Sequence, residues 1–301
     1  IIHVDTGTFN ENIIISKDIQ LISLHGPDST IIKSDTTLSC VYVNIDTLNY
    51  YQNFYLNYQN QNFSIGDSLF SLYQSNVIID GFTIKNGSGT HPIGHNHKWG
   101  GGLLIELGNE AIIKNCKIIN NSAEYGGGIG VRKYAYGHFE NCIISNNSSN
   151  EGAGGWIRTL SNFKTSSFVN CLISDNLGST YGVGLYVQGS SLDFNHTTIY
   201  NNSAGSIRGS VGSTNIFNFK NSIIDYIWGS NTTTATYSYD SWGNFYYSDS
   251  TNVYNNLNFV DAANQDYRLS DSSSCIGAGI NDSVTIDLDG NNRPLPIGSN
   301  S

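Results

Sequence analysis

Short runs of alternating apolar and polar residues recur along most of this chain. Each run is four or five residues long and rich in Ile, Val and Phe, and a polar turn with Asn residues follows it. Alternation with a period of two over so few residues predicts strands and not helices. When the segments from residue 76 onwards are aligned, one apolar column steps by 34, 26, 29, 26 and 25 residues, namely Ile84, Ile118, Ile144, Ile173, Ile199 and Ile224.

Further columns repeat at the same intervals along the chain. One reads Ile79, Ile113, Phe139, Phe168, Phe194 and Phe219, and another reads Phe82, Cys116, Cys142, Cys171, Thr197 and Ser222. A separate apolar run follows each glycine cluster, at 103–105, 129–131, 155–157 and 185–187. We expect its first and third residues to face inward and its middle residue outward. Three short strands per repeat, stacked repeat on repeat, predict a parallel β-helix of about 25–29 residues per coil.

The turns between these strands also repeat. Two columns are dominated by Asn: Gly81, Asn115, Asn141, Asn170, His196 and Asn221, and then Asn86, Asn120, Asn146, Asp175 and Asn201. Asn and Asp tolerate left-handed backbone and bond their own turn, and stacked amides can bond from coil to coil, which predicts an asparagine ladder. The glycines at 126–128 lack the Lys and Ser/Thr of a phosphate-binding loop, so we expect a corner there.

The composition favours an extracellular β protein over a cytosolic helical one. Only 13% of the 301 residues are charged, against roughly 25% in an average domain. The net charge of −10 disfavours nucleic acids and anionic membranes as partners. No apolar run approaches the ~18 residues of a membrane span, and the five scattered cysteines are expected to be buried thiols. We therefore expect a secreted or cell-surface protein, in a mature or trimmed form, with no membrane insertion.

The repeat also suggests how the chain is organised. We expect one all-β domain over residues 1–301, a single-stranded solenoid. Within it, we assign 1–47 to N-terminal coils, 48–70 to a Tyr- and Asn-rich insertion, 71–225 to regular repeats and 226–301 to irregular C-terminal coils and a tail.

The pattern NC-x-I-x-NN-x-A…GGGI resembles the right-handed parallel β-helix repeat proteins of the pectate-lyase-like superfamily. The similarity is greatest to exported bacterial surface proteins and polymorphic outer-membrane-type repeats, and it covers residues 76–225. The resemblance implies a right-handed β-helix. It does not select a function, because this architecture carries lyases, hydrolases, epimerases and adhesins.

The outward face of the third strand is the first candidate site. Leu104, Gly130, Trp156 and Tyr186 share one outward column, and Glu106, Arg132, Arg158 and Gln188 share the next. Aromatic faces and guanidinium groups commonly hold sugars, so Trp156, Tyr186, Arg132, Arg158, Glu106 and Gln188 are predicted ligand-binding residues. The alternative is that the same residues only form the solvent-exposed surface of a sheet and bind no ligand.

The loop of the 34-residue repeat is the second candidate. It gathers His91, His95 and His97 beside Lys98 and Trp99. Zinc sites normally need three or four ligands, and no Cys or carboxylate stands at a fitting spacing. We therefore predict no metal, with the three histidines as the candidates if one is bound, and we add Trp99 to the ligand-binding face.

The sequence allows two functions. The first is a structural, adhesive or glycan-binding module that contacts a polysaccharide or cell-surface glycan and can assemble end to end with itself. The alternative is a polysaccharide lyase, or less readily a glycoside hydrolase, acting on the third-strand face. We expect no cofactor. If the protein is a lyase, the resemblance implies a Lys or Arg base, often with calcium bound by a carboxylate cluster; the candidates are Arg132, Arg158, Lys98 and, as proton donor, Tyr125. The carboxylate cluster that either enzyme needs is missing between residues 76 and 225.

Overall fold

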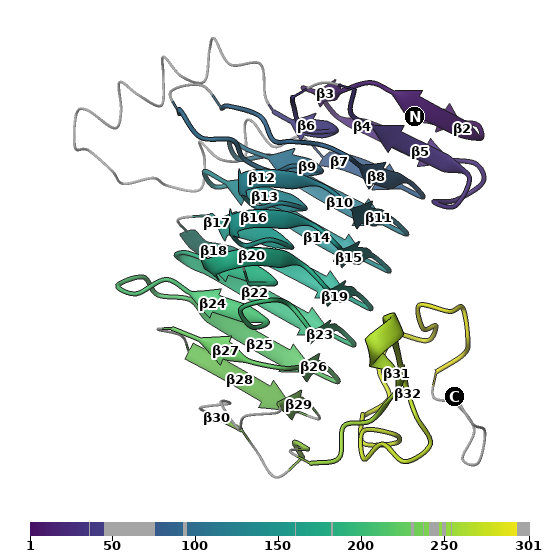
Figure 1. Ribbon diagram of the computed structural model, residues 1–301, viewed down its shortest axis with the longest axis vertical. Coiled ribbons are helices and arrows are strands. Elements are labelled where there is room, and N and C mark those ends of the chain that lie inside the picture. The colour runs from purple at the N-terminus through teal and green to yellow at the C-terminus, as the bar shows by residue number, and fades with distance from the viewer. Residues whose placement is uncertain are drawn as a thin grey trace.

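The chain winds into a right-handed parallel β-helix, as predicted (Figure 1). The computed structural model describes residues 1–35, 37–44, 76–92, 95–159, 161–181, 183–229, 232–236, 238–240, 247–248, 251–253 and 255–293. The predicted insertion at 48–70 lies outside the described residues. The domain boundaries proposed above stay predictions.

Three long parallel sheets run along the solenoid, and each of the first eight coils adds one strand to each of them. The first sheet consists of β1 (Ile2–Val4), β4 (Ile19–Ser23), β7 (Asn76–Asp80), β10 (Glu110–Lys114), β14 (Tyr136–Glu140), β18 (Ser161–Val169), β22 (Ser190–Asn195), β25 (Ile216–Lys220), β28 (Thr232–Thr236) and β30 (Tyr247–Ser248). The second sheet consists of β2 (Gly7–Asn10), β5 (Thr30–Lys33), β8 (Thr83–Lys85), β11 (Lys117–Ile119), β15 (Ile143–Ser145), β19 (Leu172–Ser174), β23 (Thr198–Tyr200), β26 (Ile223–Ile224) and β29 (Tyr239–Asp240). The third sheet consists of β3 (Ile13–Ile15), β6 (Val41–Val43), β9 (Leu103–Ile105), β13 (Ile129–Arg132), β17 (Gly155–Arg158), β21 (Leu185–Val187), β24 (Ile207–Gly209) and β27 (Ile227–Trp228).

A fourth, shorter sheet lies between the second and the third, and the sequence pattern did not predict it. It consists of β12 (Ser122–Tyr125), β16 (Ser148–Glu151) and β20 (Leu177–Tyr181). These strands precede the glycine corners. Gly126 has a φ of +69°, and a Cβ on Gly127 would lie 2.4 Å from the carbonyl oxygen of Ser148. The corner therefore needs glycine both for its backbone angle and for the close approach of the next coil.

The predicted inward columns form one continuous core. Their apolar members are all buried, and the phenylalanine rings of neighbouring coils stack at centroid distances of 4.8, 5.4 and 4.8 Å, in the order Phe139, Phe168, Phe194 and Phe219. Four of the cysteines are buried free thiols that pack as small apolar side chains, whereas Cys275 is half-buried.

Both predicted turn columns have left-handed backbone. The nine Asn or Asp residues and His196 have φ angles between 50° and 63°, and Gly81 has a φ of 83°. One residue after the second turn column, a row of buried amides bonds from coil to coil. Asn121 donates to Asn147 (3.0 Å), Asn147 donates to Asn176 (3.0 Å), and Asn176 donates to Asn202 (2.9 Å). These amides also donate to backbone carbonyls of the preceding coil, so they join successive coils inside the solenoid.

The C-terminal segment, residues 255–293, leaves the solenoid and folds back beside the second sheet (Figure 1). It contains β31 (Phe259–Asp261), the short 3-10 helix η1 (Ala262–Asn264) and β32 (Asp266–Leu269). The Tyr267 hydroxyl donates to Asp175 (2.6 Å), and its ring packs against Tyr200. Residues 287–291 form a turn, in which the Gly290 N–H donates to the Asp287 carbonyl (3.1 Å).

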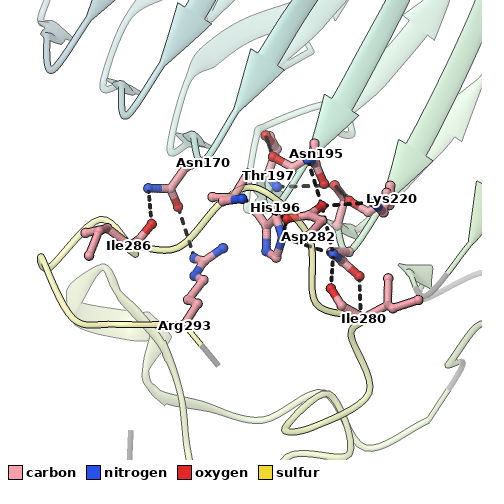
Figure 2. A network of polar contacts seen from close by, with 12 residues as sticks. Asn170, Asn195, His196, Thr197, Lys220, Ile280, Asp282, Ile286 and Arg293 are labelled. Atoms are coloured by element: carbon pink, nitrogen blue, oxygen red, sulfur yellow. Dashed lines mark hydrogen bonds and ion pairs between the residues drawn. The ribbon is translucent and has the colours of Figure 1, made fainter. Parts of the chain in front are cut away.

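Polar contacts fasten the end of this segment to the first turn column (Figure 2). The Asp282 carboxylate accepts hydrogen bonds from His196 (3.0 Å) and Asn195 (3.1 Å) and pairs with Lys220 (3.0 Å). Arg293 donates to Asn170 (3.0 Å), one coil away. Burial raises the pKa of Asp282, but hydrogen bonds from the Val284 N–H, Lys220, Asn195 and His196 outweigh it and hold the pKa well below the usual range.

Candidate ligand-binding face

The outward column of the third sheet is longer than the sequence predicted. Strand pairing places the predicted members Leu104, Gly130, Trp156 and Tyr186 in register, and it extends the column at both ends. Over the described strands the outer column reads Ile14, Tyr42, Leu104, Gly130, Trp156, Tyr186, Arg208 and Trp228. Arg132 and Arg158 are register partners in the neighbouring column, as predicted.

The middle of the outer column, from Leu104 to Trp156, is covered, contrary to the expectation of an accessible face. The loop that ends in Trp99 folds back over it, and Trp99 packs between Leu104 and Trp156 with both tryptophans at most 5% exposed. The Trp99 ring stacks on Tyr125 at 4.4 Å and meets Trp156 edge-on at 4.3 Å. Gly130 makes room for this loop, since a Cβ there would lie 3.0 Å from the Gly100 nitrogen. Trp156 is therefore part of a secondary aromatic core and not a platform for a ligand.

Arg132 lies beneath the same loop in a buried charge cluster, which we define as Tyr42, His95, Trp99, Glu106 and Arg132. The Arg132 and Glu106 side chains are 2% and 1% exposed and form an ion pair at 3.1 Å. Tyr42 donates to the other Glu106 oxygen (2.5 Å). The Arg132 guanidinium lies 4.4 Å from the Trp99 ring and donates to Nε2 of His95 (2.7 Å). Glu106, Trp99 and His95 surround Arg132. Its guanidinium is therefore not available to a ligand, although the sequence predicted that it would be.

The histidines of the loop are engaged in other contacts. His95 accepts a hydrogen bond from Arg132, while His97 pairs with Glu124 at 2.5 Å and His91 is exposed. Burial and, to a smaller extent, the charges of Arg132 and its neighbours lower the pKa of His95 to about 4. Within the described ranges, no three His, Cys, Asp or Glu side chains are grouped closely enough to hold a metal ion.

The remaining predicted residues line the rim of the covered region. Arg158 is half-buried, with its guanidinium 5.9 Å from the Trp156 ring. Lys98 and Gln188 are also half-buried. Burial and, to a smaller extent, the charges of Glu151 and Glu124 raise the pKa of the Tyr125 hydroxyl. The structure thus places these side chains around the covered loop but does not join them into one catalytic group.

The C-terminal end of the outer column is open. Arg208 lies between two aromatic rings, 4.1 Å from the Tyr181 centroid and 4.4 Å from the Trp228 centroid. Tyr181 is 41% exposed and Trp228 is 52% exposed. Tyr186 is the register partner of Arg208, and its ring forms an edge contact with Tyr181. We call Tyr181, Tyr186, Arg208 and Trp228 the open aromatic end.

Sequence reasoning predicted Tyr186 but missed Arg208 and Trp228 of this open end, although a signal for both was present. The segments Ile207-Arg208-Gly209 and Ile227-Trp228-Gly229 follow the same rule as the earlier third strands, with an inward residue before an outward one. Both inward residues, Ile207 and Ile227, are buried in the core. Extending the alignment by two coils would have placed Arg208 and Trp228 on the outer face.

Among the described residues, no helix is long and apolar enough to cross a bilayer. No known protein family and no curated protein matches the sequence. Two solved structures are similar in three dimensions. A pectin methylesterase from Yersinia enterocolitica is 12% identical with a TM-score of 0.47, over 83% of this chain and 88% of its own. Pectin methylesterase PemA from Erwinia chrysanthemi is 11% identical with a TM-score of 0.45, over 82% of this chain and 83% of its own. The fold is established by the strand pairing described above and not by these two likenesses.

Proposed function

We propose that this protein is a secreted or cell-surface β-helix module that binds glycans at its open aromatic end. The observation that carries the proposal is the Arg208 guanidinium between the Tyr181 and Trp228 rings, with both rings substantially exposed. Large apolar rings left in water on a rigid sheet are costly unless a ligand covers them.

The geometry suits a polysaccharide better than a compact ligand. Tyr186, Arg208 and Trp228 project from successive coils, about 4.8 Å apart, along a flat sheet. Aromatic rings stack on the apolar faces of sugars, and a guanidinium pairs with carboxylate through two parallel hydrogen bonds. A chain with net charge −10 needs such a local cation to hold an acidic sugar. Acidic polysaccharides are therefore the ligand class that we favour.

Binding to a panel of acidic and neutral polysaccharides tests the proposal. We expect Trp228→Ala to weaken binding by at least about tenfold, because it removes an exposed stacking surface, and Arg208→Ala to weaken binding of acidic glycans selectively. Arg268→Ala is the matched control, since Arg268 is an exposed arginine of the C-terminal segment paired with Asp266. Absence of binding across the panel, or an equal loss in the control, would contradict the proposal. Unsaturated products or new reducing ends in the same incubations would instead support the lyase or hydrolase alternative.

End-to-end assembly remains part of the proposed structural role. Light scattering at rising protein concentration and electron microscopy measure it directly. A particle that stays monomeric throughout would exclude self-assembly while leaving glycan binding unaffected.

A further inference from the structure

A hydrogen-bonded Ser, His and Glu chain lies on the outer face of the first sheet, away from the open aromatic end. Nδ1 of His138 is 3.0 Å from Oγ of Ser167, and Nε2 of His138 is 3.1 Å from Oε1 of Glu110. The Lys164 ammonium donates to Oε2 of Glu110 at 2.7 Å. Three successive coils supply these side chains, from β10, β14 and β18.

Strand register brings the group together. In β14, Phe139 points into the core, so His138 before it points outward. His138 pairs in register with Ser167 of β18, and Glu110 stands on β10, two residues before the register partner of His138. A register shift in β18 between Ser161 and Thr165 brings Lys164 to the same carboxylate. The constellation is a property of stacked coils and is invisible in any one strand.

The hydrogen-bond partners define the protonation pattern. An ionised carboxylate only accepts hydrogen bonds, so Nε2 of His138 carries the proton that it donates to Glu110. Nδ1 then holds a lone pair and accepts the hydroxyl proton of Ser167. The hydrogen bond from His138, and then that from Lys164, lower the pKa of Glu110 to about 2 and keep it ionised. Nucleophile, base and orienting carboxylate thus stand in the order that activates a serine.

We propose that Ser167 is the nucleophile of a second site, one that transfers acyl groups from esters, with His138 as its general base and Glu110 as a positioning residue. Oγ of Ser167 attacks the ester carbonyl carbon while its proton passes to Nδ1 of His138. The carbon–oxygen bond of the ester then breaks, and the leaving oxygen anion takes that proton and departs as the neutral hydroxyl compound, a phenol for an aryl ester. Water attacks the acyl-serine and gives a proton to Nδ1 of His138. The bond between the acyl carbon and Oγ of Ser167 then breaks, Oγ takes that proton back, and the carboxylic acid leaves.

The surroundings restrict the substrate class. Strand β18 is paired on both sides, by β14 and β22, so its backbone N–H groups are engaged in the sheet and do not form an oxyanion hole. One missing oxyanion donor costs roughly 10²–10³ in rate, so only esters with good leaving groups should react. Asp193 lies opposite Ser167 in the next coil, and its charge disfavours anionic ligands. The expected substrates are small, uncharged aryl esters. His138 is 31% exposed and Ser167 is partly exposed, so such a molecule can reach them.

Labelling of the full chain with a fluorophosphonate probe, followed by mass spectrometry of the adduct, tests the assignment. We expect the adduct on Ser167, and we expect 4-nitrophenyl acetate hydrolysis above the buffer rate. Ser167→Ala should abolish both, and His138→Ala should reduce both by about 10²-fold or more. Ser148→Ala is the control, since Ser148 is an exposed serine of β16 on another sheet, and it should change neither. Circular dichroism verifies that each variant is folded.

Two variants test the role of Glu110. Glu110→Gln replaces the ionised acceptor of the His138 hydrogen bond by a neutral amide, so it should lower kcat for 4-nitrophenyl acetate with little change in KM, and Glu110→Asp, which keeps a carboxylate, should retain more of the rate. A purely structural role of Glu110 would lower the yield of folded protein without changing kcat of the folded fraction. An adduct on another residue, no adduct at all, or full activity in Ser167→Ala would overturn the proposal. None of these results bears on glycan binding at the open aromatic end.

Discussion

Asn147 allows the contribution of the buried amide row to be measured. Its side chain is fully buried and takes part in four hydrogen bonds: it accepts from the backbone and side-chain amides of Asn121 and donates to the Ile118 carbonyl and to Asn176. A buried hydrogen bond contributes about 1 kcal/mol net, within about 0.5 kcal/mol either way. Asn147→Ala should therefore lower the free energy of unfolding by about 4 kcal/mol, within a range of about 2–6 kcal/mol. That is a large share of the roughly 5–15 kcal/mol that stabilises a typical protein.

Equilibrium urea unfolding, followed by tryptophan fluorescence, measures this loss for the wild type and the variant. The matched control is Asn150→Ala, in the same coil but exposed, which should change stability by no more than about 0.5 kcal/mol. If Asn147→Ala lowers the free energy of unfolding by less than about 1 kcal/mol, and its slope against urea concentration is unchanged, the reasoning is refuted. Such a result would mean that water or rearranged neighbours satisfy the groups left behind.

Two further predictions concern the covered loop and the C-terminal segment. The folded pKa of His95 is about 4 against an ordinary value of 6.5, so its contribution to stability is present above about pH 6.5 and is lost as the pH falls towards 4. His95→Gln should flatten the pH dependence of the unfolding free energy over that interval, and an unchanged slope would contradict this expectation. Asp282→Ala removes the partner of His196 and Lys220, so hydrogen exchange at the Ile280 and Val284 amides should accelerate at least about tenfold. Asp271→Ala, at an exposed site in the same segment, is the control, and equal rates in both variants would show that Asp282 does not anchor the segment.

The sequence predicted the solenoid itself in detail. The inward columns, the left-handed turns and the glycine corners all follow from a local pattern repeated coil after coil. Register is inherited in such an architecture, because each strand can pair only with its equivalent in the next coil. Arg132 and Arg158 therefore had to be neighbours once the repeat was recognised.

The sequence left open which outward side chains water can reach. Nothing in the repeat states that the loop ending in Trp99 turns back over Leu104, so Arg132 and Trp156 were predicted to be accessible and are buried. The same reasoning placed the candidate site at the covered middle of the outer column instead of at Arg208 and Trp228.

The difference between what could and could not be predicted has one physical cause. Alternation and turn chemistry act over a few residues and therefore appear in the sequence, whereas the path of an insertion or a tail depends on the surface it packs against. The sequence by itself determined the coils, the core and the neighbours in each column. Only the tertiary structure decided that the loop covers the buried charge cluster, that Asp282 fastens the C-terminal segment to His196, and that Ser167 meets His138 and Glu110 across three coils.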